Sequence, residues 1–144
     1  MIENFLYFLL YAKVEFTTIK TQNVQQTINQ SPQKVWKGKV SSYSATYGGC
    51  LGCQKYWDSK GQLYYITACG NRLNDSAYTI AFNRFPCGTR VSLVNLSNQK
   101  SVAAVVNDTG GFESLGRIAD LSIATAQAIE AVTDQSLIEI SKVP

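Results

Sequence analysis

The stretch VVNDTGGFESLGRIADLS, residues 105–122, places one aspartate shortly after an apolar segment and another within a second apolar segment. The first, Asp108, precedes a Gly-Gly pair, and the second is Asp120. Aspartate beside glycine is typical of a turn in which the carboxylate bonds the neighbouring backbone. The alternative is a carboxylate placed at a strand end for chemistry. Which interpretation holds for Asp108 decides whether this stretch is a turn or a site.

The composition predicts one soluble globular domain. The chain has 144 residues, of which 45% are hydrophobic and 16% charged. Its net charge of +3 is scattered along the sequence, so we expect no nucleic-acid partner. There is no histidine, which excludes Ser-His and Cys-His nucleophile pairs and His-ligated metal sites. Acid–base chemistry must therefore rest mainly on carboxylates, and we expect no cofactor and no metal.

Four cysteines lie in the middle of the chain, and they indicate either two disulfides or a zinc site. A zinc ribbon requires two close pairs, whereas only the first two cysteines are close in sequence. The spacing therefore favours disulfides over zinc or free thiols, and it leaves the pairing open. The candidates are Cys50, Cys53, Cys69 and Cys87.

Residues 1–37 differ from the remainder and predict an N-terminal segment and arm. The apolar run at residues 5–12 is too short to span a bilayer. Only Glu3 is charged before that run and Lys13 follows it, which favours a retained packing or anchoring segment over a cleaved signal peptide, the alternative that stays open. Residues 17–37 are rich in Thr, Gln and Asn, as in a linker. We expect a domain at residues 38–144.

That domain has the pattern of a mainly β fold. We predict strands at residues 39–47, 63–67, 90–96, 101–106, 118–121 and 137–143, with a hairpin turn at residues 97–100. Ser122 is expected to cap one short helix over residues 123–132. The apolar face of that helix would consist of Ile123, Ala126, Ile129 and Val132. Short strands with one helix indicate a small barrel.

Four ordered segments resemble the rare lipoprotein A family: TACGNRLND (67–75), residues 79–102, NDTGGF (107–112) and GRIADLS (116–122). The resemblance covers roughly residues 38–143. It implies a six-stranded double-psi β-barrel. Members of the family include septal lytic transglycosylases, so it also implies peptidoglycan glycan strands as partner and a periplasmic or extracellular place in the cell envelope. Such enzymes protonate the glycosidic oxygen, and the sugar's own hydroxyl then attacks to give a 1,6-anhydro product.

The resemblance assigns roles to individual residues. Asp108 matches the aspartate of the family's N-D-R-G-P-F motif and would be the catalytic acid and base. Arg117 and Asp120 match the segment that shapes the same groove. Asp120 is the second catalytic candidate, and its alternative role is as a buried partner of Arg117 or as a residue that orients the loop before the helix cap. Residues 108–111 also resemble the D-T-G-G of membrane-bound lytic transglycosylase A and the 3D domain, which assigns substrate contacts to Thr109, Gly110 and Gly111.

One position departs from the family pattern. The family usually has a histidine four residues before the proline of its P-x-G-T motif, and here Phe82 occupies that position. Its neighbour Asn83 can bind a sugar hydroxyl or water, but an amide cannot shuttle a proton at neutral pH. Of the tyrosines and tryptophans that could stack on sugar, Tyr47 is preferred because it adjoins Gly48-Gly49. Asp75, in an Asn-Asp-Ser turn, is more typical of a turn former than of a base.

The missing histidine keeps other functions open. The first alternative is a non-catalytic glycan-binding or assembly module that retains the groove. The second is a structural component of a larger particle, such as a phage tail tip in a virion, with residues 1–37 docking to an assembly partner. Cys50 and Cys53 could form a redox pair, but the absence of a βαβ pattern favours a structural disulfide.

Overall fold

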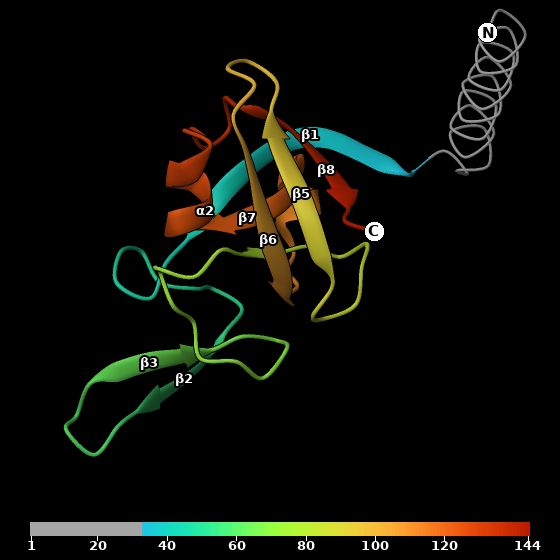
Figure 1. Ribbon diagram of the computed structural model, residues 1–144. Coiled ribbons are helices and arrows are strands. Elements are labelled where there is room, and N and C mark those ends of the chain that lie inside the picture. The colour runs from blue at the N-terminus through green and yellow to red at the C-terminus, as the bar shows by residue number, and fades with distance from the viewer. Residues whose placement is uncertain (1–32) are drawn as a thin grey trace, which may run out of the picture. The chain divides into compact units, whose positions relative to one another are not determined.

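The computed structural model describes residues 33–144. Six strands close into a barrel in the order β1-β7-β4-β6-β5-β8, and β2 and β3 form a separate two-stranded sheet (Figure 1). This confirms the predicted six-stranded barrel with one short helix. The elements are β1 Val35–Tyr43, β2 Gln54–Trp57, β3 Leu63–Ile66, β4 Thr79–Ala81, β5 Arg90–Asn95, β6 Ser101–Asp108, the 3₁₀ helix η1 Phe112–Leu115, β7 Arg117–Ser122, α2 Ile123–Ala128 and β8 Leu137–Lys142.

The strand order of the barrel has an internal two-fold symmetry, although the sequence contains no evident repeat. Two neighbouring pairs, β1 with β7 and β4 with β6, are parallel, and the other neighbours are antiparallel. Exchanging β1, β4 and β5 with β6, β7 and β8 leaves the strand order unchanged. Each parallel pair places a strand from one half beside a strand from the other half. The two halves are therefore interlocked, and neither can close a sheet alone.

The barrel interior is an aliphatic core. The alternation in β5 buries Val91 and Leu93, and in β8 it buries Ile138 and Ile140, all at 0% exposure. Trp36 packs edge-on against Phe82, with ring centroids 5.7 Å apart. Burial of these side chains is the main stabilising contribution of the fold.

The helix is shorter than predicted. Ser122 caps it as expected, because its hydroxyl accepts a hydrogen bond from the Thr125 backbone N–H. However, α2 ends at Ala128 rather than at residue 132. The Asn95 side chain donates to the carbonyl oxygens of Ile129 and Glu130, and the backbone leaves the helix at Glu130 with φ of 50°. Ile129 remains buried, whereas the predicted apolar-face residue Val132 is 50% exposed.

Among the strands, β1 differs most from its predicted bounds. β1 spans Val35–Tyr43 instead of residues 39–47, and β8 holds its first residues, pairing Val35 with Ser141. The stretch 44–47 is instead a loop. β1 thus includes three residues that were assigned to the arm. Residues 1–32 lie outside the described part of the chain, so the boundary at residue 37 and the role of the N-terminal segment stay predictions.

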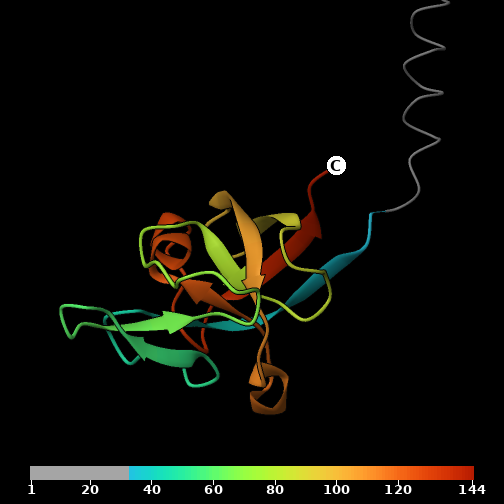
Figure 2. The same ribbon diagram turned by 90° about the horizontal axis from the view of Figure 1, so that it is seen from below.

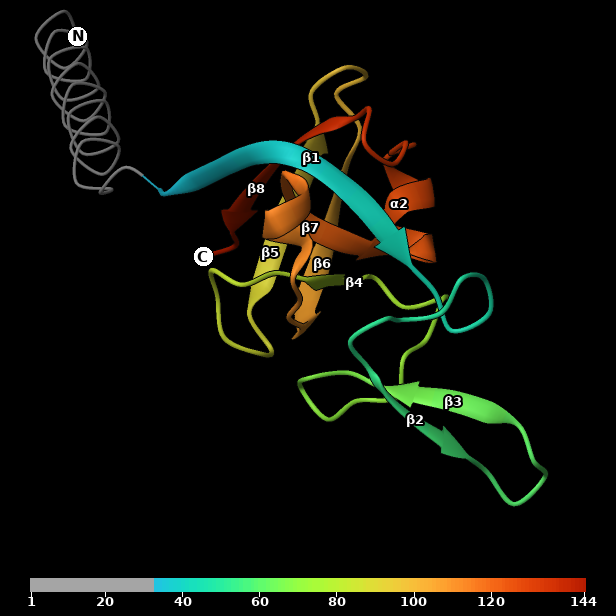
Figure 3. The ribbon, with the colours of Figure 1, turned by 180° about the vertical axis from the view of Figure 1, so that it is seen from behind.

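The segment between β1 and β4 is an excursion from the barrel. Seen from behind, β1 leads into the loop before β2, and the β2–β3 hairpin extends away from the barrel strands (Figure 3). Seen from below, the two strands of the hairpin lie side by side (Figure 2). Neither β2 nor β4, which has only three residues, was predicted from periodicity. In residues 33–144, no helix is long and apolar enough to cross a membrane.

Candidate active site

Asp108 is the last residue of β6, where the barrel strand meets the excursion. β6 runs parallel to β4, and a register shift between Ile80 and Ala81 brings Ala81 opposite Asp108. The backbone carbonyl of Asp108 accepts a hydrogen bond from the Phe82 N–H at 3.0 Å. The strand pairing therefore fixes the backbone of Asp108. The residue as a whole is only 4% exposed.

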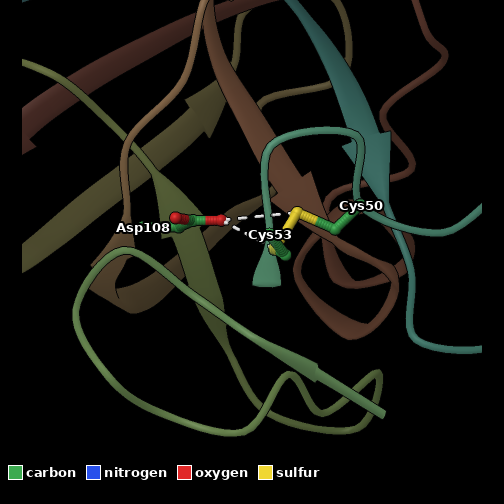
Figure 4. A group of neighbouring side chains, drawn as sticks. All are labelled: Cys50, Cys53 and Asp108. Carbon is green, nitrogen blue, oxygen red and sulfur yellow. Dashed lines mark hydrogen bonds between the residues drawn. A yellow bond between two sulfur atoms is a disulfide. The ribbon is translucent and has the colours of Figure 1, made fainter. Parts of the chain in front are cut away.

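The two carboxylate oxygens of Asp108 have different surroundings. Oδ1 accepts hydrogen bonds from the backbone N–H groups of Ala68 at 2.7 Å and Thr109 at 2.9 Å. Oδ2 lies 3.7 Å from the Sγ of Cys50 and 3.5 Å from the Sγ of Cys53 (Figure 4). The bond to Thr109 is the local contact expected of a turn aspartate, whereas Ala68 is distant in sequence. Asp108 thus makes the local contact of a turn residue, and its carboxylate is also held by the backbone of a segment 40 residues earlier.

The contacts at Oδ2 are not conventional hydrogen bonds. Cys50 and Cys53 form a disulfide, so neither sulfur carries a proton to donate to the carboxylate. The sulfur atoms and the carboxylate lie within 4.8 Å of one another, as in a metal site. However, metal binding requires thiolates, and the disulfide removes both. The disulfide is therefore an apolar cover over Oδ2.

Burial raises the pKa of Asp108 above its usual range. The N–H groups of Ala68 and Thr109 act in the opposite direction because they favour the charged form, and the negative charge of Asp120 adds to the increase. A raised carboxyl pKa keeps a larger fraction protonated near neutral pH. That is the property a general acid requires.

A cleft of about 490 Å³ contains most of the predicted site. Its lining brings together seven of the eight catalytic or substrate-binding candidates: Tyr47, Asp108, Thr109, Gly110, Gly111, Arg117 and Asp120. Asn83 is not part of the lining. Tyr47 is 77% exposed, so its ring is available for stacking, while Tyr43 is buried and unsuited to that role. The cleft also includes residues to which the sequence assigned no role, namely Ser41, Ala81, Phe112, Leu115 and Thr133.

The second acidic candidate, Asp120, is held by β1. Ser41 lies opposite Asp120 in the parallel β1–β7 pair, and its hydroxyl donates to Asp120 Oδ1. Arg117 does not bind Asp120. It forms a two-pronged salt bridge with Asp134, with both contacts at 2.6 Å. The alternative role of Asp120 as partner of Arg117 is therefore wrong, and its carboxylate remains in the cleft.

Asn83 supports the loop that follows Asp108. Its side-chain amide donates to the Gly110 carbonyl oxygen at 2.9 Å and accepts from the Gly110 N–H at 3.1 Å. This reciprocal pair holds residues 109–111 without occupying the cleft. Phe82, at the position of the family's histidine, is 0% exposed and packs in the barrel core. Residue 82 is thus a core side chain that cannot transfer a proton.

Asp75 anchors the loop that precedes Tyr47 and does not itself line the cleft. Its carboxylate accepts hydrogen bonds from the Ser44 hydroxyl and from the N–H groups of Ala45 and Thr46. Although burial alone would raise the pKa of Asp75, these hydrogen bonds hold it below the usual range. Asp75 therefore orders the loop that carries Tyr47, which is a turn-forming role.

The preference for disulfides over zinc is confirmed, and the pairing left open by the sequence is Cys50–Cys53 and Cys69–Cys87. The first disulfide belongs to a small hydrophobic cluster between the excursion and the cleft. We call this the cleft cluster; it consists of Tyr43, Cys50, Cys53, Tyr65, Leu73, Ala81 and Phe112. The second disulfide joins the segment after β3 to the loop before β5.

A closed, interlocked six-stranded barrel with a buried carboxyl at a cleft defines the structural class, the double-psi type of barrel. No family model matches the chain. It is, however, 48% identical over 73 residues to the probable endolytic peptidoglycan transglycosylase RlpA of Synechocystis, a match that covers 51% of this chain and 22% of that protein. The endolytic peptidoglycan transglycosylase RlpA of Pasteurella multocida is 43% identical over 44% of this chain and 21% of its own length.

A longer match includes most of the barrel. The probable endolytic peptidoglycan transglycosylase RlpA of Aquifex aeolicus is 32% identical over 107 residues, covering 70% of this chain and 47% of that protein. The predicted resemblance to the RlpA-like family is confirmed by these relatives. The chain spans about a fifth of the length of the first relatives and less than half of the Aquifex protein.

Proposed function

We propose that the barrel is a peptidoglycan-cleaving lytic transglycosylase domain in which Asp108 is the general acid and base. The observation that carries the proposal is a buried carboxyl with a raised pKa in a cleft, on a chain similar to proteins named endolytic peptidoglycan transglycosylases. Two disulfides fit an oxidising compartment, which supports a place in the cell envelope.

The environment of Asp108 supports a specific division between its oxygens. Since Oδ1 accepts two N–H groups, the acidic proton resides on Oδ2, which has no such donor among the described residues. Protonated Asp108 transfers that proton to the glycosidic oxygen as the bond to the leaving sugar breaks. The resulting carboxylate then takes the proton of the sugar's 6-hydroxyl, whose oxygen closes the 1,6-anhydro ring. One carboxyl thus acts in both steps and ends protonated.

The other cleft residues support glycan binding. Tyr47 offers an exposed ring at the rim of the cleft, and Gly110 and Gly111 allow a polymer to approach the backbone closely. Asp120 contributes a negative charge that favours the protonated form of Asp108 and stabilises positive charge that develops on the sugar ring.

The core position of Phe82 favours a second candidate, a glycan-binding module without turnover. The two functions are separated by measuring binding and release on insoluble peptidoglycan. Wild type, Asp108→Asn and the control Asp58→Asn should all sediment with the polymer. Asp58 lies in the β2–β3 turn, where its Oδ1 accepts two backbone N–H groups that asparagine can also bond.

The proposal expects soluble glycan fragments from wild type and Asp58→Asn but none from Asp108→Asn. Binding by all three proteins without release would contradict the enzymatic function and support the binding module. Absence of binding by all three would contradict both.

A further inference from the structure

The Cys50–Cys53 disulfide is placed against the one carboxyl that the proposed chemistry uses. Both sulfurs lie within 3.7 Å of Asp108 Oδ2, the oxygen without an N–H donor among residues 33–144. Cys50 lines the cleft together with Leu51 and Gly52. The disulfide therefore separates Oδ2 from the water that would otherwise solvate it on this side.

The chain is shaped to hold the disulfide there. Gly48 and Gly49 adopt left-handed conformations, with φ of 75° and 71°, immediately before Cys50. A Cβ on Gly49 would lie 2.7 Å from the Tyr65 hydroxyl oxygen, so only glycine allows this approach. Tyr65 in turn belongs to the cleft cluster with both cysteines. The loop packs the disulfide between this cluster and the carboxyl.

We propose that the Cys50–Cys53 disulfide is a redox-sensitive positioning element that keeps Asp108 protonated and is switched off by reduction. The proposal rests on the proposed function of Asp108 for its catalytic consequence. Its reductant is a dithiol: one thiolate attacks a sulfur of the disulfide, the second thiol displaces the mixed disulfide, and the dithiol becomes oxidised. Two electrons and two protons pass to Cys50 and Cys53, which become thiols.

The cleft is the side from which such a reductant approaches, because Cys50 lines it, although Cys50 and Cys53 are themselves only 8% and 9% exposed. Leu51, between the two cysteines, is fully exposed and lines the cleft. After reduction, each thiol can donate a weak hydrogen bond to Oδ2, and separation of the sulfurs admits water. Both changes favour the carboxylate form.

The Cys69–Cys87 disulfide provides a matched control, because its loss is not expected to lower the pKa of Asp108. Cys69 follows Ala68, whose N–H bonds Oδ1 and lowers the pKa of Asp108. Loss of the Cys69–Cys87 bond can only loosen that hydrogen bond, and so leaves the pKa of Asp108 unchanged or raises it. Neither Cys69 nor Cys87 lines the cleft.

The test is a ¹³C NMR titration of the Asp108 carboxyl carbon, assigned by its absence in Asp108→Asn. It uses the C69A/C87A variant, in which dithiothreitol reduces only Cys50–Cys53, and the C50A/C53A variant without reductant. We expect reduction and C50A/C53A to move the pKa of Asp108 downward relative to oxidised C69A/C87A and to wild type. The alkaline limb of the glycan-release rate should move to lower pH in step.

An unchanged or raised pKa of Asp108 after reduction would overturn the inference and leave the proposed function intact. Absence of turnover by oxidised wild type would contradict the proposed function. The NMR titration would still decide whether the disulfide controls the pKa of the Asp108 carboxyl. If C50A/C53A does not fold, the comparison of oxidised with reduced C69A/C87A still tests the inference.

Discussion

The barrel core and the cleft cluster bury apolar surface with different side chains. The barrel core contains aliphatic residues and Phe82, with Leu93, Ile138 and Ile140 at 0% exposure. The cleft cluster contains two tyrosines, a disulfide and few aliphatic groups. The first arrangement stabilises the fold, whereas the second surrounds an ionisable group with weakly polar surface. The difference indicates that stability and proposed chemistry depend on separate regions.

The largest expected effect is on turnover by Asp108→Asn. Removing a general acid decreases the rate by about 10²- to 10⁴-fold. The asparagine Oδ1 can still accept the N–H groups of Ala68 and Thr109, so folding is preserved. Glycan-release rates at equal folded concentration check this outcome. A loss of less than tenfold would show that Asp108 is not the acid.

The same variant separates stability from activity through pH. The folded-state pKa of Asp108 is raised, so its contribution to stability is present below the ordinary aspartate pKa of about 3.9 and is lost as pH rises through the folded-state value. Asparagine does not titrate. Asp108→Asn should therefore gain in stability relative to wild type as pH rises through that window. Urea unfolding at several pH values measures the gain, and a growing loss would contradict the raised pKa.

Leu93→Ala tests the barrel core. Deleting this fully buried side chain should cost about 2 to 5 kcal/mol of unfolding free energy. Leu93 is not part of the cleft, so the release rate per folded molecule should not change. Chemical denaturation and activity below the unfolding transition provide both values. A large decrease in the rate of the folded variant would show that the two regions are not separate.

The two disulfides should differ in their contributions to stability. Cys69–Cys87 joins residues 18 apart in sequence, and loop closure predicts a loss of about 3 kcal/mol in C69A/C87A. Cys50–Cys53 joins residues only 3 apart, for which the same relation gives about 2 kcal/mol. Thermal and urea unfolding of the two variants make the comparison. A greater loss in C50A/C53A would indicate that the cleft disulfide is mainly structural.

The smallest expected effect concerns the glycines before Cys50. Gly48→Ala and Gly49→Ala each place an alanine at positive φ, which costs about 1 to 2 kcal/mol. Only the second also meets the Tyr65 hydroxyl, because nothing lies within 4 Å of a Cβ at Gly48. Gly49→Ala should therefore be the less stable variant and lower the pKa of Asp108. Equal stability and an unchanged titration would show that this close approach does not position the disulfide.

The sequence predicted the features that depend on local pattern. The β5–β6 hairpin was predicted from the alternation in residues 90–96 and the turn at residues 97–100. The helix cap was predicted from Ser122. The helix end was wrong because Asn95, 34 residues earlier, binds the Ile129 carbonyl. Most candidate residues of the cleft came from the family motifs. The contact of the Cys50–Cys53 disulfide with Asp108 joins residues more than 50 apart and has no local signal.

Mass spectrometry of peptidoglycan digested with wild type and Asp108→Asn tests the central claim most directly. The account predicts fragments ending in 1,6-anhydro sugar from wild type and none from Asp108→Asn. Fragments with ordinary reducing ends would contradict a transglycosylase and indicate hydrolysis, with Asp120 as the second carboxylate. Anhydro fragments from both proteins would contradict the role of Asp108.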